Sequence, residues 1–270
     1  MSDSPHDKGP LLGQQVAGSE TYDPGLLFPV PRENARSRLA EPRVIASGED
    51  VWHAYELSWL SATGMPQICM GTLRIPSTSP NLVESKSLKL YLNSLNNHRF
   101  ESNDGAKSVI IGDVAKVVGS PVELSLHRVD SAEFSGEALP GACLDDREVS
   151  VPASPDDARL VAQAGDATWY THLMRSRCPV TNQPDWATVV VESRGCSPTP
   201  DSLLAHLLSF RNHQEFHEQC VERIYAELWT ATAPEYLSVH ALYTRRGGLD
   251  ICPWRCSEAR PAPLYRLNRQ

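Results

Sequence analysis

The sequence of 270 residues has no long apolar run and no excess of basic residues. No stretch approaches the roughly 18 consecutive apolar residues that a membrane-spanning helix needs. The first residues, MSDSPHDKGPLLGQQ, lack the basic-then-apolar pattern of a secretory signal, so we expect a cytoplasmic protein. The net charge is -8, whereas a general nucleic-acid binder needs basic faces that neutralise phosphates. We therefore expect neither a membrane nor a nucleic acid as partner.

Three familiar site patterns are also missing. The chain has no HExxH and no CxxC, and no GxGxxG follows a predicted strand, so a Rossmann cofactor site is not indicated. The seven cysteines are an odd number and are expected to be thiols in a reducing compartment. His213 and His217, and likewise Cys252 and Cys256, are four residues apart, which leaves a zinc site conceivable. We nevertheless expect no metal.

Apolar and aromatic patterns predict the secondary structure. In the first half, strands are predicted at 51–60, 67–76 and 121–129, and helices at 84–100 and 105–118. In the second half, strands are predicted at 187–195 and on both sides of Gly-Gly within 235–255, and helices at 200–213 and 213–229. Each half thus contains, in this order, one or more strands, a pair of helices and one or more further strands. This order predicts an α+β protein with antiparallel sheets and paired helices on one face.

The chain divides most naturally near its middle. Residues 131–158 are rich in Pro, Gly and Ser breakers, and we predict an N-terminal arm at 1–30 followed by modules at 31–140 and 141–270. SLNNHRF (94–100) echoes SFRNHQEF (209–216) at an offset of about 115 residues, which favours an ancient duplication. Such sheets have open edges, so the modules should pair into a barrel or self-associate.

The stretch SRCPVTNQPDW (176–186) places a thiol and a carboxyl on one short loop. Cys178 follows Arg177, and nearby positive charge favours the thiolate, which is the nucleophilic form. Asp185 can return towards the thiol across the turn. It can donate a proton near neutral pH only if it is buried beside apolar groups, for which Pro184 and Trp186 are candidates. The alternative is two unrelated loop residues.

Two further stretches suggest ligand binding. His217 and Glu218 begin the long helix, where an imidazole and a carboxylate can recognise a donor-rich edge such as that of guanine, or can simply form a solvated face. In ESKSLK (84–89), Glu84 either opens a helix or contacts a substrate, while Ser85 and Lys86 can meet a phosphate at the helix N-terminus.

In TRRGGLDICPWR (244–255), two arginines precede a Gly-Gly turn that can approach a phosphate closely. Arg246 and Lys86 carry the positive charge that a 2′-phosphate requires. The motif therefore indicates a phosphate-bearing cofactor bound in some other way than on a Rossmann fold.

Taken together, these motifs resemble the NADPH-dependent 7-cyano-7-deazaguanine reductases, the nitrile reductases of queuosine biosynthesis, in their long two-module form. The resemblance rests on YELSWL, ESKSLKLYLNS, CPVTNQPDW, SFRNHQEFHEQCVERI and YTRRGGLDICPWR, which span nearly the whole chain beyond the arm. It implies two tandem tunnelling-fold (T-fold) modules, related to a GTP cyclohydrolase type, as well as NADPH as cofactor and a homodimer.

The resemblance also implies roles for individual residues. Cys178 matches the nucleophile that forms a covalent thioimide, and Asp185 matches the proton donor. Positions that match substrate-binding residues are Val83, Glu84, Ser85, His217 and Glu218, and those that match NADPH contacts are Ser85, Lys86, Arg246 and Gly247. Two details differ from the pattern: Cys252 stands where the family usually has asparagine, and Val191-Glu192-Ser193 repeats residues 83–85 without the lysine, which we interpret as a strand remnant.

Two other functions fit some of the same residues. One is a cysteine- or zinc-dependent purine or pterin hydrolase, similar to a cyclohydrolase, on the same fold. The other is a non-catalytic purine-binding module. The hydrolase would act without oxidising a nicotinamide, and the binding module would form no adduct on Cys178.

Overall fold

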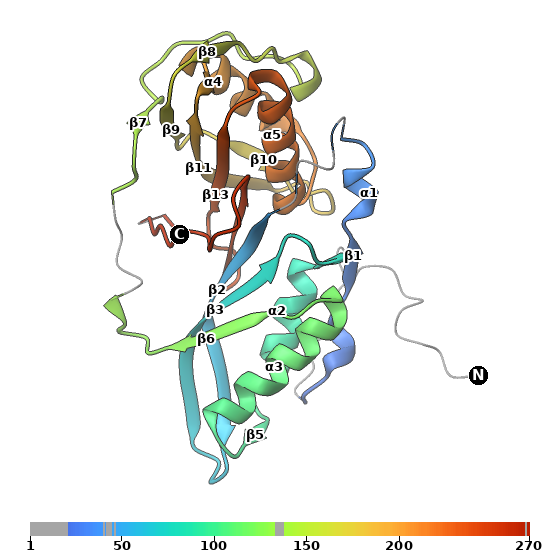
Figure 1. Cartoon of the computed structure of the whole chain (residues 1–270). Coiled ribbons are helices and arrows are strands. Elements are labelled where there is room, and N and C mark those ends of the chain that lie inside the picture. Colours follow the sequence, from blue (N-terminus) through green and yellow to red (C-terminus); the bar gives the residue numbers. More distant parts are fainter. Residues whose placement is uncertain (1–20, 40, 42–44, 46, 133–137, 268) are drawn as a thin grey trace, which may run out of the picture. The chain divides into compact units, whose positions relative to one another are not determined.

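A computed structural model describes residues 21–39, 41, 45, 47–132, 138–267 and 269–270 (Figure 1). The chain forms two compact units: the first comprises 1–33, 52–133 and 246–249, and the second 34–51, 134–245 and 250–270. Most of the predicted N-terminal arm, residues 1–20, lies outside the described residues. Both units combine helices with mainly antiparallel strands, which confirms the α+β class. No helix in the described ranges is long and apolar enough to cross a membrane.

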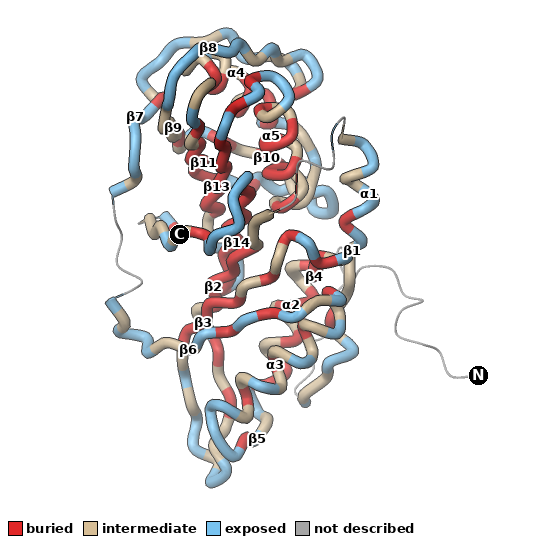
Figure 2. The backbone as a smooth tube through the Cα atoms, viewed as in Figure 1, coloured by how far each residue is buried: buried red, intermediate tan, exposed pale blue. Residues whose placement is uncertain are grey.

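The first unit has a sheet in the order β6-β3-β2, with two helices packed on it. Its elements are η2 (Pro24–Leu26), β1 (Pro29–Pro31), β2 (Gly48–Ser61, from Trp52 on), β3 (Pro66–Pro76), β4 (Asn81–Val83), α2 (Ser85–Ser94), β5 (Arg99–Phe100), α3 (Asn103–Val118) and β6 (Glu123–His127). Leu88 of α2 and Ile110 of α3 line an interior space with Trp52, Leu73 and Leu124 of the sheet. Figure 2 shows buried stretches on both helices and on the strands of this sheet. Both helices therefore cover the same face.

The helix predicted at 84–100 is shorter in the structure, where α2 ends at Ser94. Ser94 Oγ donates a hydrogen bond back to the carbonyl of Tyr91 (2.6 Å), and a turn follows at 95–97. Asn side chains compete for backbone hydrogen bonds and favour turns over helix interiors. Arg99 and Phe100 then pair in parallel with Leu60 and Ser61 of β2. The helical spacing of the leucines continues past this turn, and the prediction therefore extended the helix too far.

The second unit contains the sheet order β14-β13-β11-β9-β7, with β10 also paired to β11. Its elements are α1 (Glu33–Arg36, from Asn34 on), β7 (Ala142–Cys143), η5 (Pro155–Asp157), β8 (Ala162–Ala164), β9 (Ala167–Thr171), β10 (Arg175–Arg177), β11 (Pro184–Arg194), β12 (Cys196–Pro198), α4 (Pro200–Ser209), η6 (Phe210–Asn212), α5 (His217–Thr232), β13 (Tyr236–Tyr243) and β14 (Leu249–Cys256, from Asp250 on). Residues 191–193 lie inside β11 and are strand, as predicted.

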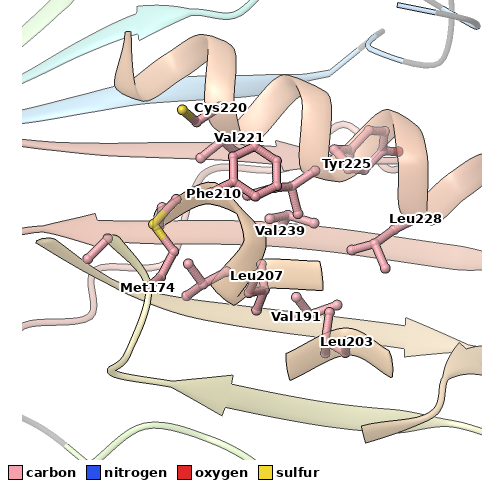
Figure 3. Packing of buried hydrophobic residues seen from close by; sticks show 14 of the residues in the cluster. Met174, Val191, Leu203, Leu207, Phe210, Cys220, Val221, Tyr225, Leu228 and Val239 are labelled. Carbon is pink, nitrogen blue, oxygen red and sulfur yellow. The ribbon is translucent and has the colours of Figure 1, made fainter. Parts of the chain in front are cut away.

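The core of the second unit lies between α4 and α5 and the strands β11 and β13 (Figure 3). Leu207, Phe210 and Val221 from the helical layer and Val191 and Val239 from the sheet are at most 1% exposed. The long helix begins at His217, four residues later than predicted, and the Gln219 side chain accepts a hydrogen bond from the backbone N–H of residue 216 (3.4 Å). The residues before it are therefore free to run beside β10.

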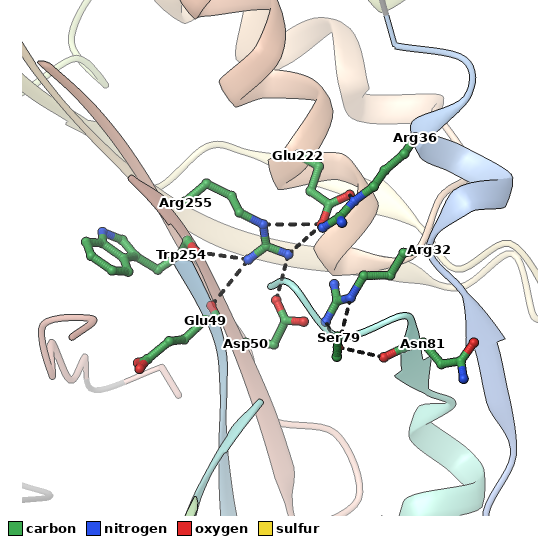
Figure 4. A network of polar contacts seen from close by, with 9 residues as sticks. All are labelled: Arg32, Arg36, Glu49, Asp50, Ser79, Asn81, Glu222, Trp254 and Arg255. Carbon is green, nitrogen blue, oxygen red and sulfur yellow. Dashed lines mark hydrogen bonds and ion pairs between the residues drawn. The ribbon is translucent and has the colours of Figure 1, made fainter. Parts of the chain in front are cut away.

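A buried arginine joins three parts of the second unit (Figure 4). Arg255 is 0% exposed, and its Nη2 lies 2.8 Å from Asp50 Oδ1 and 2.9 Å from Glu222 Oε1. Burial by itself would lower the pKa of Arg255, but the two carboxylates outweigh this and hold it above its usual value. Arg36 Nη2 lies 2.6 Å from the same Glu222 oxygen. The segment after residue 33 is thereby tied to α5.

The first unit has a smaller polar anchor of its own, also drawn in Figure 4. Arg32, 2% exposed, donates from both Nε and Nη2 to Ser79 Oγ at 3.1 Å. Ser79 Oγ donates in turn to the carbonyl of Asn81 (2.9 Å). This holds the strand β1, which pairs with β4 and so with Val83 just before α2.

Candidate active site

The hairpin formed by β10 and β11 brings Cys178 and Asp185 onto one face. Ser176 pairs with Asp185 in the antiparallel register, and the backbone N–H of Cys178 donates to the carbonyl of Gln183 at 3.0 Å. Side chains two residues apart on a strand share a face, and so do cross-strand partners. Cys178 and Asp185 are therefore diagonal neighbours, for which the usual separation is about 7–8 Å.

The turn of this hairpin leaves the Cys178 sulfur half-buried at its start. Asn182 adopts a left-handed conformation (φ 57°), which asparagine tolerates better than most residues. Its Oδ1 accepts hydrogen bonds from Arg177 Nη1 (3.2 Å) and Gln214 Nε2 (3.0 Å). The backbone N–H of Thr181 points at Cys178 Sγ (3.5 Å). The turn that carries the thiol is thus held in shape by hydrogen bonds from Arg177 and from Gln214.

Asp185 is 2% exposed, but the prediction that its flanking residues bury it is wrong. Strand alternation turns Trp186 to the opposite face, where it is 38% exposed and lies near the guanidinium groups of Arg175 and Arg211. The burial comes instead from α5 and β13, including Cys220. The carboxyl therefore lies inside the unit, although its neighbours in sequence are at the surface.

The groups around Asp185 include two that stay uncharged. Burial, chiefly, raises the pKa of Cys220 and of Tyr243 well above the usual values, so both remain protonated near neutral pH. Ser176 lies within reach of both and is 0% exposed. A carboxyl group in these surroundings has neutral polar neighbours on its buried side.

His217 and Glu218 occupy the first turn of α5, beside the hairpin. His217 Nε2 lies 3.6 Å from Asp185 Oδ2, and its ring meets Tyr243 edge-on with centroids 4.1 Å apart. Glu218 is 3% exposed, and the positive end of the helix dipole favours a carboxylate at this position. The structure thus brings Asp185 and His217 together in the second unit, with Cys178 on the same hairpin as Asp185 and Glu218 next to His217 on α5.

The predicted residues of the first unit cluster at the start of α2. Glu84 is its N-cap: Oε1 accepts from the N–H of Lys86 (2.9 Å) and Oε2 from the N–H of Ser87 (2.8 Å). Burial raises the pKa of Glu84, while these hydrogen bonds act in the opposite direction. Ser85 Oγ lies 3.4 Å from Glu84 Oε1, and Val83 ends β4 immediately before it. Helix capping is therefore one role of Glu84; Oε1 accepts from both Lys86 and Ser85, whereas Oε2 keeps a second lone pair.

The Gly-Gly motif forms the predicted tight turn, also in the first unit. Arg246 N–H donates to the carbonyl of Leu249 (2.9 Å), and both glycines have positive φ (61° and 79°), as a type I′ hairpin turn requires. A Cβ at Gly247 would collide with Nζ of Lys89 on α2. The sequence analysis missed Lys89, although its spacing of three residues from Lys86 is a signal that could have found it.

The spacings that left a zinc site conceivable do not assemble one from those residues. His213 precedes the helix, and its Nε2 lies 3.0 Å from Glu215 Oε2, whereas His217 faces Asp185. Cys252 and Cys256 are each 1% exposed within β14. Cys252 Sγ accepts a hydrogen bond from the Gln270 side chain (3.1 Å), so this departure from the family pattern is accommodated by local packing.

Known proteins resemble this chain over most of its length. The model described as "Nitrile reductase, 7-cyano-7-deazaguanine-reductase N-term" matches residues 19–126, and "QueF-like protein" matches residues 184–262. Proteins named NADPH-dependent 7-cyano-7-deazaguanine reductase from Acinetobacter baylyi and Teredinibacter turnerae are each 45% identical, covering 96% and 95% of this chain and 98% and 95% of their own lengths. A crystal structure of the archaeosine synthase QueF-Like in the apo form, 20% identical, covers 42% of this chain and all of its own with a TM-score of 0.30. By its family matches and its near full-length relatives, the chain belongs to the NADPH-dependent 7-cyano-7-deazaguanine reductases.

Proposed function

We propose that this chain reduces the nitrile of 7-cyano-7-deazaguanine to the aminomethyl group of 7-aminomethyl-7-deazaguanine, with NADPH as reductant, in queuosine biosynthesis. The observation that carries the proposal is the β10–β11 hairpin, which places a half-buried thiol and a buried carboxyl on one face. Relatives of near full length are named for this activity.

The first step joins Cys178 to the substrate. The thiolate sulfur adds to the nitrile carbon, one π bond of the triple bond breaks, and Asp185 gives its proton to the nitrogen. The product is a thioimide, and Asp185 is left as a carboxylate. Asp185 is 2% exposed, and burial disfavours the charged form of a carboxyl; His217 Nε2, 3.6 Å from Asp185 Oδ2, can return the proton.

Reduction to the amine then requires two hydrides, which NADPH supplies when bound. After the first, Cys178 leaves the carbon as a thiolate and an imine remains. Water would hydrolyse that imine, so the pocket must stay closed until the second reduction. Cys178 thus acts only in the first half of the reaction, while Asp185 and His217 can serve proton transfer in both halves.

Substrate recognition is assigned to Val83, Glu84, Ser85, His217 and Glu218. A carboxylate can accept hydrogen bonds from both the ring N–H and the exocyclic amine of a guanine-like edge. Glu218 lies in the first turn of α5, where the helix dipole favours the carboxylate form. Glu84 already accepts two backbone N–H groups and the Ser85 hydroxyl, and would use the remaining lone pair of Oε2.

The residues assigned to NADPH are Ser85, Lys86, Arg246 and Gly247, and the first unit fits a phosphate-bearing group at them. The glycine turn has no side chain and lies against Lys89 on α2. The N–H groups of Lys86 and Ser87 are taken by Glu84, so the phosphate contacts must come mainly from side chains. Lysine and arginine side chains are suited to this.

We also propose two T-fold modules at 31–140 and 141–270, a homodimer and a cytoplasmic location. Support comes from the family resemblance and from the edges of the sheets, which need covering. Sedimentation equilibrium of the full chain tests the dimer, and a monomer at micromolar concentration would contradict it.

The function is tested by mixing the chain with 7-cyano-7-deazaguanine and NADPH while recording nicotinamide absorbance and intact protein mass. The proposal predicts two NADPH oxidised per amine formed, and an adduct with the mass of the nitrile on Cys178 when NADPH is omitted. A hydrolase would yield product without NADPH oxidation. A binding module would yield neither product nor adduct.

Lys86→Ala should raise the KM for NADPH about tenfold or more, because a charge-assisted contact to phosphate is lost. The kcat and the KM for the nitrile should change little, since neither depends on that charge. Steady-state kinetics at saturating nitrile measure the effect. Lys116→Ala, an exposed lysine near the end of α3, is the matched control. An unchanged KM for NADPH in Lys86→Ala would remove this residue from the cofactor site.

A further inference from the structure

A thiol, a carboxylate and an imidazole meet in the second unit, away from the residues assigned to nitrile reduction. Ligand atoms of Cys143, Asp145 and His172 all lie within 4.8 Å of one another. Their meeting follows from the register of two strands: β7 runs parallel to β9 with Cys143 opposite Tyr170, and the next N–H, of residue 144, donates to the Tyr170 carbonyl (2.8 Å). Residues two apart on a strand share a face. Cys143 and Asp145 therefore point to the same side of the sheet as Tyr170 and His172.

The neighbours of these three side chains hold them in place. His172 Nδ1 lies 2.8 Å from Thr188 Oγ1, which leaves Nε2 for another partner. The Tyr170 ring packs edge-on against the imidazole, with centroids 5.4 Å apart. Asp145 Oδ1 accepts from Thr171 Oγ1 (2.6 Å) and from the N–H of His172 (3.1 Å). An imidazole oriented through its second nitrogen and a hydrogen-bonded carboxylate are the usual surroundings of metal ligands.

We propose that Cys143, Asp145 and His172 bind one Zn²⁺ ion, with solvent in the fourth position. A thiolate and an imidazole are poor ligands for Ca²⁺ and Mg²⁺, which take oxygen, but suit zinc. Three protein ligands with one open position are common in zinc sites. The charges of the thiolate and the carboxylate would balance those of the ion. Cys143 is exposed, so the ion can enter from solvent.

The bound ion would join two segments of the chain. The strand β7 has only two residues, and the stretch that follows it to β8 contains a single short 3-10 helix. A metal bridging residues 143 and 145 to residue 172 would hold this stretch to β9. Binding to the folded state alone would raise the melting temperature of the protein. This role does not depend on the proposed reductase activity.

Titration of the full chain with Co²⁺, in a non-thiol reductant, tests the proposal directly. We expect an absorption band from thiolate-to-cobalt charge transfer that saturates at one equivalent and is displaced by Zn²⁺. Cys143→Ser should abolish the band and weaken Zn²⁺ binding more than tenfold, as measured by competition with a chromophoric chelator. Cys196→Ser, which alters a half-buried thiol of the same unit, is the matched control and should keep the band.

A second variant removes the hydrogen bond that orients His172 without removing a metal ligand. Thr188 is 0% exposed, and Thr188→Val, which keeps its shape, should lower Zn²⁺ affinity about 10- to 100-fold by freeing the imidazole. Zn²⁺ should raise the melting temperature of the parent chain but not of Cys143→Ser. The proposal is overturned if the parent chain gives no charge-transfer band, or if the band survives in Cys143→Ser and is lost in Cys178→Ala.

Discussion

Cys178→Ala should abolish nitrile reduction, with kcat lowered by at least about a thousandfold, because the nucleophile proposed to form the covalent intermediate is removed. The adduct seen by intact mass should disappear as well. Alanine removes only the sulfur from a turn that is held by backbone hydrogen bonds and by Asn182. The variant should therefore fold and still bind the nitrile without reacting, which isothermal titration calorimetry can measure.

A second cysteine provides the control for this experiment. Burial raises the pKa of Cys69 to about 11, so its thiol is unreactive near neutral pH. Cys69→Ala should therefore retain both the adduct and full turnover. An adduct that persists in Cys178→Ala would show that another thiol attacks the nitrile, and the role assigned to the hairpin would then have to be given up.

Strands and turns with strong local signals were predictable from the sequence. The pairs flanking Gly64 and the Gly-Gly turn are confirmed as β2–β3 and β13–β14, because alternation and turn residues act over a few positions. Helix ends were less predictable. The helix α2 stops where Asn residues favour a turn, and α5 starts at His217, although apolar spacing continues across both points.

The candidate site was predictable only where its parts are close in the chain. Cys178 and Asp185 lie on one face of the hairpin because a single turn separates them, and their spacing alone allowed that inference. The direction of Trp186 was misjudged, because the register that turns it outward depends on pairing with β10. Tyr243 and Cys220 come from β13 and α5, and no local pattern links them to Asp185. The chemical roles themselves came from the family resemblance.

Asp185→Asn should lower the rate of adduct formation by about a hundredfold to ten-thousandfold, the range usual for loss of a general acid. Asparagine nearly matches the shape of aspartate, so Cys178 should still be presented and the nitrile should still bind. Stopped-flow measurement of adduct formation isolates this step from hydride transfer. Asp201→Asn, at an exposed aspartate that pairs with Arg147, is the matched control and should react at the parent rate.

The pH dependence separates proton donation by Asp185 from a purely structural role. A donor must carry its proton when the sulfur attacks, so the parent rate should fall as the pH rises past the pKa of the donor. Asp185→Asn should lose this fall in rate at high pH. If the variant is slow but its rate still falls at high pH, another group donates the proton, and His217, 3.6 Å from Asp185, is then the first to substitute.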